Sequence, residues 1–177
     1  MSTIQLQDVI SSIRDVPDFP KKGIIFKDIT TALKRPEIFC FTVEETYNYY
    51  KDKHITKVAG IESRGFIIGG AIACKLNAGF VPIRKPGKLP AETYSKSYSL
   101  EYGTDCLEIH KDALTEDDVV LLHDDVLATG GSANAALELI SQFNVKKIYI
   151  NFLSEISFLN GRRNISPVYD IFSLIKY

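Results

Sequence analysis

The stretch from Val119 to Ile140 constrains the fold of this chain more than any other part of the sequence. It begins with an apolar run, Val119 to Leu122, of the kind that forms a buried parallel strand. Two adjacent acids, Asp124 and Asp125, follow, and we expect the chain to turn there before a helical pattern from Ala135 to Ile140. A buried strand, a short polar turn and a helix in this order predict an α/β fold with a parallel sheet.

Between the acids and the helix lies a segment of small residues: Ala128, Thr129, Gly130, Gly131 and Ser132. Backbone N–H groups of such a loop, together with the N-terminus of the next helix, can bind a phosphate. The carboxylates of Asp124 and Asp125 accept hydrogen bonds, as the hydroxyls of a ribose require. These residue types also form ordinary solvated loops, but their order favours a site for a phosphorylated sugar.

Composition excludes several other classes of protein. A chain of 177 residues suits a single domain over 1–177, and a net charge of -1 gives no electrostatic case for nucleic acid or a membrane surface. The N-terminus carries Asp8 and lacks the apolar core of a signal peptide, and no apolar run reaches transmembrane length. We therefore expect a cytoplasmic protein.

Neither the cysteines nor the histidines have the spacing of a metal site. The cysteines are odd in number and far apart, which favours reduced thiols: Cys40, Cys74 and Cys106. The histidines are equally scattered: His54, His110 and His123. We expect no metal held by the protein alone.

Hydrophobic periodicity predicts alternating helices and strands along the rest of the chain. We expect helices at 4–16, 36–50 and 65–76, the last packed by Ile68, Ala71, Ile72 and Cys74. We expect buried strands at 57–61, 80–83, 147–153 and 168–175, a long mobile loop at 84–96 and a hairpin at 97–109. This alternation predicts a mostly parallel twisted sheet flanked by helices, with ligands at the carboxyl ends of its strands.

The segment HDDVLATGGS resembles the ribose-phosphate signature of the type I phosphoribosyltransferases. Further segments resemble the adenine-using members of that family in order and spacing, over nearly the whole chain: FPKKGIIFKDIT (19–30), GIESRGF (60–66), FVPIRKPGKLP (80–90) and SYSLEYGTDCLEIHKDAL (97–114). The resemblance implies the type I phosphoribosyltransferase fold, with a small N-terminal base-binding hood at about 1–35 and a flexible catalytic loop and hairpin at about 84–110.

The same resemblance implies a purine-salvage reaction. Adenine and 5-phosphoribosyl 1-pyrophosphate (PRPP) would give AMP and pyrophosphate through an oxocarbenium-like transition state. It further implies a homodimer and a requirement for Mg²⁺. The metal would be held through PRPP or pyrophosphate and water, with Asp124 as a candidate for an additional ligand.

The family pattern assigns a role to each matching residue. Ala128 to Ser132 would bind the 5′-phosphate, and Asp124 and Asp125 the ribose. The pyrophosphate would be bound by Ser63, Arg64, Arg84, Lys85 and Lys88, with a cis peptide between Glu62 and Ser63. Without the resemblance, the cations suit an ordinary solvated loop.

Adenine recognition falls to Ile25, Phe26 and Lys27, with the Phe26 ring stacked on the base. From the sequence alone, Phe26 is equally well an ordinary core residue. Lys27 stands where the family usually has arginine, which removes any contact that needs the planar guanidinium fork. His123 stands at a usually apolar position and receives no catalytic role.

The catalytic candidates are Glu101, Asp125 and Arg64, and Tyr102 would help to cover the site. Glu101 would handle a proton near the base or take part in loop closure, which keeps water from the activated sugar. Without the resemblance, Glu101 is equally well a surface residue of the hairpin.

Two other functions stay open. A transferase for hypoxanthine, guanine or xanthine would use the same chemistry, but those relatives carry the base-binding hood on the C-terminal side. This chain has its matching segment at 19–30 and ends at Tyr177. A non-catalytic sensor of PRPP would share the fold, but such regulators usually add a DNA-binding module, for which we expect no room.

Overall fold

The computed structural model describes residues 4–19, 21–99 and 103–177. The chain divides into two compact units, Met1–Glu45 and Thr46–Tyr177. Helix α3, Pro36–Tyr50, runs through the boundary between them. Its first residue is a proline, which fits the first turn of a helix because the backbone N–H there needs no partner. The expected helix at 36–50 is confirmed.

The N-terminal unit contains a two-stranded antiparallel sheet. Strand β1 (Arg14–Pro17) pairs with β2 (Ile25–Asp28), and a turn with positive φ at Asp18 and Gly23 connects them. Two short helices flank this pair in the sequence: α1 (Leu6–Ser12) and α2 (Thr30–Leu33).

The expected helix over 4–16 is wrong beyond Ser12. Ile13 adopts an extended conformation, φ -79° and ψ 128°. From Arg14 onward the backbone hydrogen-bonds to β2, and Arg14 Nη2 lies 2.5 Å from Asp28 Oδ2 across the pair. Strand pairing therefore overrides the helical spacing of the apolar residues.

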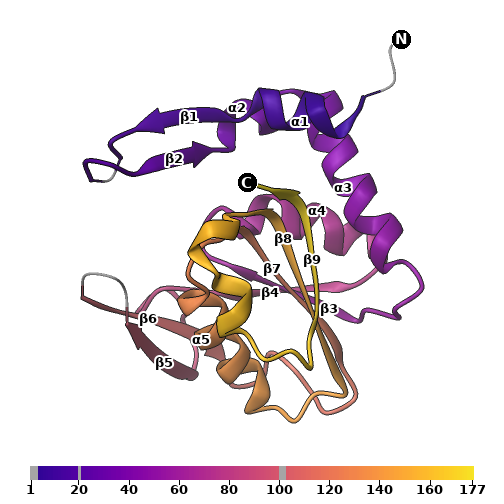
Figure 1. The fold of residues 1–177 in the computed structure, drawn as a ribbon. Helices are drawn as coiled ribbons and strands as arrows, with labels where there is room; N and C mark the ends of the chain where they lie inside the picture. The colour runs from indigo at the N-terminus through magenta and orange to yellow at the C-terminus, as the bar shows by residue number, and fades with distance from the viewer. Residues whose placement is uncertain (1–3, 20, 100–102) are drawn as a thin grey trace. The chain divides into compact units, whose positions relative to one another are not determined.

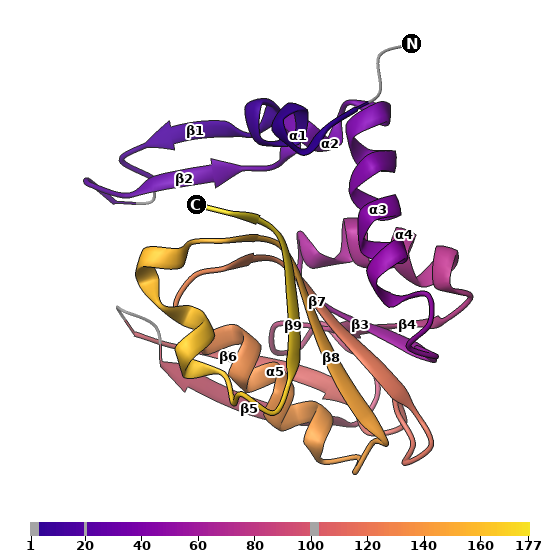
Figure 2. The same ribbon diagram turned by 45° about the vertical axis from the view of Figure 1, so that its right-hand side comes forward.

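The C-terminal unit is built on a five-stranded parallel sheet, in the order β4-β3-β7-β8-β9 (Figure 1). Its strands are β3 (Lys57–Ile61), β4 (Gly79–Ile83), β7 (Val119–Leu127), β8 (Lys147–Glu155) and β9 (Asp170–Lys176). Helix α4 (Gly65–Leu76) covers one face of the sheet and α5 (Gly131–Ser141) the other (Figure 2). The expected parallel sheet with helices on both faces is confirmed.

A hairpin and two short helical turns complete this unit. Strands β5 (Thr93–Ser99) and β6 (Thr104–His110) pair antiparallel beside α5. The 3-10 helices η1 (Ser157–Leu159) and η2 (Gly161–Asn164) lie between β8 and β9. In the described part of the chain, no helix is long and apolar enough to cross a membrane.

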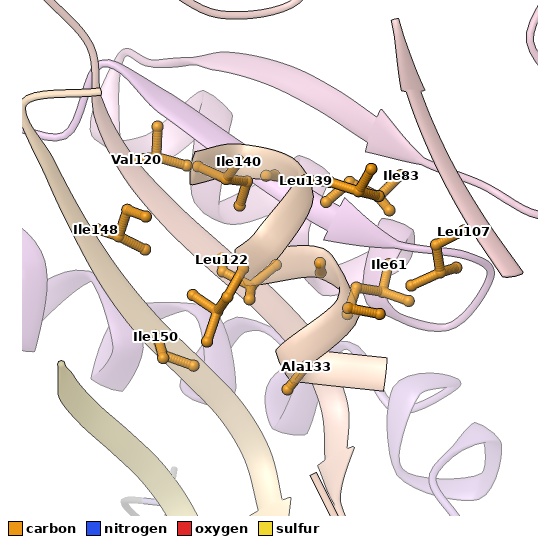
Figure 3. Packing of buried hydrophobic residues seen from close by; sticks show 14 of the residues in the cluster. Ile61, Ile83, Leu107, Val120, Leu122, Ala133, Leu139, Ile140, Ile148 and Ile150 are labelled. Carbon is orange, nitrogen blue, oxygen red and sulfur yellow. The ribbon is translucent and has the colours of Figure 1, made fainter. Parts of the chain in front are cut away.

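The main core lies between the sheet and α5 (Figure 3). Because side chains alternate between the two faces of a strand, Ala59 and Ile61 of β3 and Val120 and Leu122 of β7 enter this core from the same face. Its labelled members include Ile61, Val120, Leu122, Leu139 and Ile140, all of them buried. Each such side chain stabilises the fold by about 1.5–3 kcal/mol.

Several expectations about the ends of elements are wrong. Asp124 and Asp125 lie within β7, which pairs with β8 as far as Leu127, so the chain does not turn at them. The expected loop at 84–96 is shorter, since β5 begins at Thr93 and Arg84 exchanges two backbone hydrogen bonds with Glu108. The last strand begins at Asp170 rather than at 168.

Burial also differs from the expectation at two residues. Cys74 is exposed on α4, and Ala73 is buried in its place. Phe80 is 37% exposed because β4 is an edge strand with a neighbour on one side only. Cys40, Cys74 and Cys106 are all free cysteines.

Candidate active site

A polar cavity of about 320 Å³ lies at the carboxyl ends of β3 and β7. Parallel strands bring successive βα connections to this one edge of the sheet. Residues from four segments far apart in the sequence line it: Ile61, Glu62, Ser63, Arg64, Lys85, Tyr98, Leu107, Asp124, Asp125 and Ser132. The structure thus brings together six of the residues expected from the sequence to bind ribose, phosphate or pyrophosphate.

The two acids of β7 are held close to the start of α4. Asp125 is 3% exposed, and its backbone N–H donates to Asp124 Oδ1 at 2.9 Å. A Cβ on Gly65 would lie 3.2 Å from the same oxygen, so the missing side chain lets α4 approach the strand. Burial, together with the negative charge of Asp125, raises the pKa of Asp124.

Arg64 is the cation nearest to the acid pair. It caps the N-terminus of α4 and follows the Glu62–Ser63 cis peptide, as expected. Its Nε lies 2.5 Å from Asp125 Oδ2, yet that oxygen accepts no hydrogen bond within the described residues. The contact is therefore one of opposite charges without hydrogen-bond geometry.

Glu62 holds the start of the cationic segment. Arg84 donates to both of its carboxylate oxygens at 3.1 Å, and the Lys85 N–H donates to Oε2 at 3.0 Å. The hydrogen bonds from Arg84 lower the pKa of Glu62. Arg84 Nη1 also donates to the carbonyl of Lys88 at 3.0 Å, while the exposed Lys88 is absent from the cavity lining.

Lys85 reaches the cavity in contact with the β5–β6 hairpin. Its Nζ pairs with the carboxylate of Asp105 and lies 3.4 Å from the Tyr98 hydroxyl, which also hydrogen-bonds to Asp105. Burial lowers the pKa of Lys85 more than any single partner raises it, but the hydrogen bonds and charges of Asp105 and Tyr98 together outweigh burial, and the pKa is raised.

Sequence reasoning missed the roles of Glu62, Tyr98 and Asp105. Tyr98 and Asp105 are direct partners in the hairpin. Counting outward from Gly103 would have placed Tyr98 opposite Glu108 instead, so the sequence alone did not reveal this pair.

The expected phosphate loop lines a second cavity of about 200 Å³, bounded by Tyr98 and residues 126–133. Gly130 adopts φ +87°, a conformation that glycine accepts readily, and caps the N-terminus of α5. Thr129 is exposed. The loop thus combines a helix N-terminus with small side chains, as a phosphate requires.

The expected adenine-binding residues lie on β2 of the N-terminal unit. The ring of Phe26 packs edge-on against Phe19 at 5.2 Å between centroids, and Ile25 is 55% exposed. Lys27 Nζ lies 2.7 Å from Asp15 Oδ1. Glu101 and Tyr102 lie outside the described residues.

His123 is buried next to the acids, on β7. Its Nδ1 lies 2.6 Å from Asn151 Oδ1, and the Asn151 amide nitrogen donates to the carbonyl of Phe172. These contacts make Nδ1 the protonated nitrogen, while Nε2 has no hydrogen-bond partner among the described residues. Burial lowers the pKa of His123 to about 4.

We expect His123 to make the fold sensitive to acid. The unfolded chain binds its proton below pH 6.5, whereas the folded chain stays neutral down to about pH 4. Its contribution is therefore fully present above pH 6.5 and is lost as the pH falls toward 4, at about 1.4 kcal/mol per pH unit. Denaturant unfolding of His123→Gln should show a shallower pH slope in this window.

His54→Asn is the matched control, because His54 is exposed and its left-handed conformation, φ 54°, suits asparagine. It should leave the slope as in the wild type. Equal slopes for the wild type and His123→Gln would contradict the assignment of a neutral buried histidine.

The described residues contain no cluster of three or more histidines, cysteines or acids that could hold a metal ion. The carboxylates of half-buried Asp124 and buried Asp125 nevertheless provide hard oxygen ligands. Mg²⁺ commonly takes one or two carboxylates together with substrate phosphates and water. The residues present therefore fit a magnesium ion that arrives with a phosphorylated substrate.

Comparison with known proteins agrees with this geometry. The family model for the phosphoribosyl transferase domain matches residues 39–156, a span that contains both cavities. The chain therefore belongs to the phosphoribosyltransferase family, whose fold it shares.

Individual relatives define the branch of the family. The adenine phosphoribosyltransferase of Bacteroides thetaiotaomicron is 58% identical over 156 residues, which cover 88% of this chain and 89% of that protein. The Giardia lamblia enzyme, solved with 9-deazaadenine, superposes with a TM-score of 0.95 at 46% identity, over 99% of each chain. The Saccharomyces cerevisiae enzyme superposes with a TM-score of 0.90 at 36% identity, over 96% of this chain and 97% of that chain. Within the family, this chain is a member of the adenine phosphoribosyltransferases.

Proposed function

We propose that this chain converts adenine and PRPP to AMP and pyrophosphate. The observation that carries the proposal is the single cavity that joins Asp124 and Asp125 to Arg64, Lys85 and the first turn of α5. An acid pair beside two cations and a phosphate loop suits a ribose that carries phosphate on one side and pyrophosphate on the other.

The ligands of two relatives support this choice of substrates. The Giardia lamblia enzyme was solved with 9-deazaadenine, an adenine analogue. The Saccharomyces cerevisiae enzyme was solved with adenine and an imino-altritol bisphosphate. A base and a doubly phosphorylated sugar analogue are the two kinds of ligand that the proposed reaction needs.

The phosphate loop and the acid pair hold the sugar. Residues 128–132 bind the 5′-phosphate through backbone N–H groups and the hydroxyls of Thr129 and Ser132, and the N-terminus of α5 adds about 0.3–1 kcal/mol. Asp124 and Asp125 accept hydrogen bonds from the ribose hydroxyls. When the ribose binds, these hydrogen bonds replace the contact between Asp125 and Arg64. Their negative charge stabilises the positive character that develops on the sugar.

The cations stabilise pyrophosphate as the leaving group. Ser63 and Arg64, after the cis peptide, and Lys85, with its hairpin partners, face the same cavity. Lys88 adds positive charge from the exposed end of the cationic segment that begins at Arg84. Arg84 also contributes its positive charge, and Glu62 fixes the orientation of the Arg84 side chain. A Mg²⁺ ion bound through PRPP supplies further positive charge to the pyrophosphate oxygens.

Adenine recognition falls to β2. The Phe26 ring offers a flat apolar surface to the base, and the backbone groups of Ile25 and Lys27 read its edge. The ion pair between Lys27 and Asp15 leaves backbone recognition intact. Glu101 is our candidate for proton transfer or loop closure, with Tyr102 covering the site.

A panel of bases tests the proposal directly. With PRPP and Mg²⁺, adenine should give AMP, hypoxanthine should be a poor substrate, and removal of the metal with a chelator should abolish turnover. Efficient use of hypoxanthine would contradict the choice of base, and PRPP binding without turnover of any base would favour a sensor. Sedimentation should give twice the chain mass of 19.8 kDa, as expected of a homodimer.

We expect Asp105 and pyrophosphate to compete for the ammonium group of Lys85. Asp105→Asn removes one negative charge from the cavity wall and leaves a neutral partner of the same shape. Product inhibition by pyrophosphate should strengthen about threefold to tenfold, or roughly 1 kcal/mol, and Lys85→Met should weaken it. An unchanged inhibition constant in both variants would exclude Lys85 from the pyrophosphate site.

A further inference from the structure

The 3-10 helix η2 packs against the phosphate loop. The Ala128 carbonyl oxygen lies so close to Gly161 that a Cβ there would overlap it, and a Cβ on Gly130 would lie 2.9 Å from the Gly161 carbonyl oxygen. The side-chain amide of Asn164 donates to the Thr129 carbonyl at 2.9 Å. Two consecutive carbonyls of the loop therefore face η2, whereas neither Gly161 nor Asn164 lines the phosphate-loop cavity.

The planarity of the peptide bond fixes where the loop's donors point. In a trans peptide the C=O and N–H groups point in opposite directions, and of the described peptides only Glu62–Ser63 is cis. With the Thr129 carbonyl directed at Asn164, the Gly130 N–H is directed away from it. The same argument applies to the Ala128 carbonyl and the Thr129 N–H. Neither N–H donates to a described residue, so both remain available to an anion.

Asn164 is itself held from two sides. The Asn134 amide, from the first turn of α5, donates to the Asn164 carbonyl at 2.8 Å. Two residues earlier, Arg162 donates to the carboxylate of Glu155, which is 7% exposed, and to the carbonyl of Ile171 at 3.0 Å. The amide of Asn164 thus reaches Thr129 from a segment anchored to β8, β9 and α5.

We propose that Asn164 is a positioning residue for the 5′-phosphate: its amide fixes the peptide between Thr129 and Gly130 so that the Gly130 N–H points at the phosphate. This inference rests on the proposed function, because it assumes that residues 128–132 bind that phosphate. Asn164 touches no substrate and acts through the loop alone.

Asn164→Ala and Asn164→Asp test the role. The alanine removes the donor, and the aspartate keeps the shape but places a carboxylate against the Thr129 carbonyl. The KM for PRPP and the Kd for AMP should rise about tenfold in the alanine variant, equivalent to about 1.4 kcal/mol, and further in the aspartate variant. The KM for adenine, inhibition by pyrophosphate and kcat should stay within about twofold of the wild type.

Ser166→Ala is the matched control, since Ser166 is exposed on the same segment and its hydroxyl makes no hydrogen bond to the described residues. A merely structural role would lower Tm and change the constants for adenine and PRPP alike. AMP binding by both variants with the wild-type Kd would overturn the inference while leaving the proposed function intact. A wild-type protein that neither binds AMP nor uses PRPP would overturn both.

Discussion

Asp125→Asn should lower kcat by about 10²–10³-fold, as the loss of a group that stabilises transition-state charge does. Asp125 is almost fully buried at the cavity, and its Oδ2 has no hydrogen-bond donor among the described residues. Asparagine keeps the shape but loses the charge and one acceptor. Steady-state turnover with adenine and PRPP measures the loss.

The same substitution should affect stability much less. The charge left without its partner is that of Arg64, whose side chain is 38% exposed and can be solvated. The free energy of unfolding should therefore change by no more than about 1 kcal/mol. Asp117→Asn, at an exposed turn, is the control and should leave both quantities unchanged. Wild-type turnover in a folded Asp125→Asn variant would exclude this residue from ribose binding.

Gly130→Val should abolish AMP binding and lower Tm. Valine is strained at φ +87°, at a cost of about 1–3 kcal/mol. Its Cβ would also lie 2.9 Å from the carbonyl oxygen of Gly161, a backbone atom that η2 holds in place. The loop must move away from η2, so the donors aimed at the phosphate change direction. Calorimetric titration with AMP and a thermal melt measure the two effects.

Gly23→Val separates the effect of backbone strain on Tm from the effect of the collision with η2. Gly23 has nearly the same conformation, φ +88°, but a Cβ there meets no atom of the described residues within 4 Å. It should therefore share the cost of strain and lose less Tm than Gly130→Val. Equal losses of Tm would show that η2 does not restrict the loop, and normal AMP binding by Gly130→Val would exclude the loop from the phosphate site.

Local patterns in the sequence were enough to predict most of the helices and strands of the C-terminal unit. The apolar run from Val119 predicted β7, and the spacing of apolar residues predicted α4 at its observed bounds, Gly65–Leu76. Such elements can be predicted because apolar residues are buried, and their spacing along the chain shows which face of a helix or strand is buried. The prediction failed where pairing between strands determines the secondary structure. Arg14–Pro17 forms a strand because β2 lies beside it. Strand β7 continues through its two acids because its neighbour β8 continues as well.

The residue types at the site could likewise be predicted, but not their partners. The sequence by itself determined an acid pair, a glycine loop before a helix and a cationic segment, because each is a short contiguous pattern. Only the tertiary structure decided that Arg64 meets Asp125, that Lys85 meets Asp105, and that Asn164 holds the carbonyl of Thr129. These contacts join residues 20 to 61 positions apart, and they depend on which strand ends and turns the parallel sheet brings to the same edge.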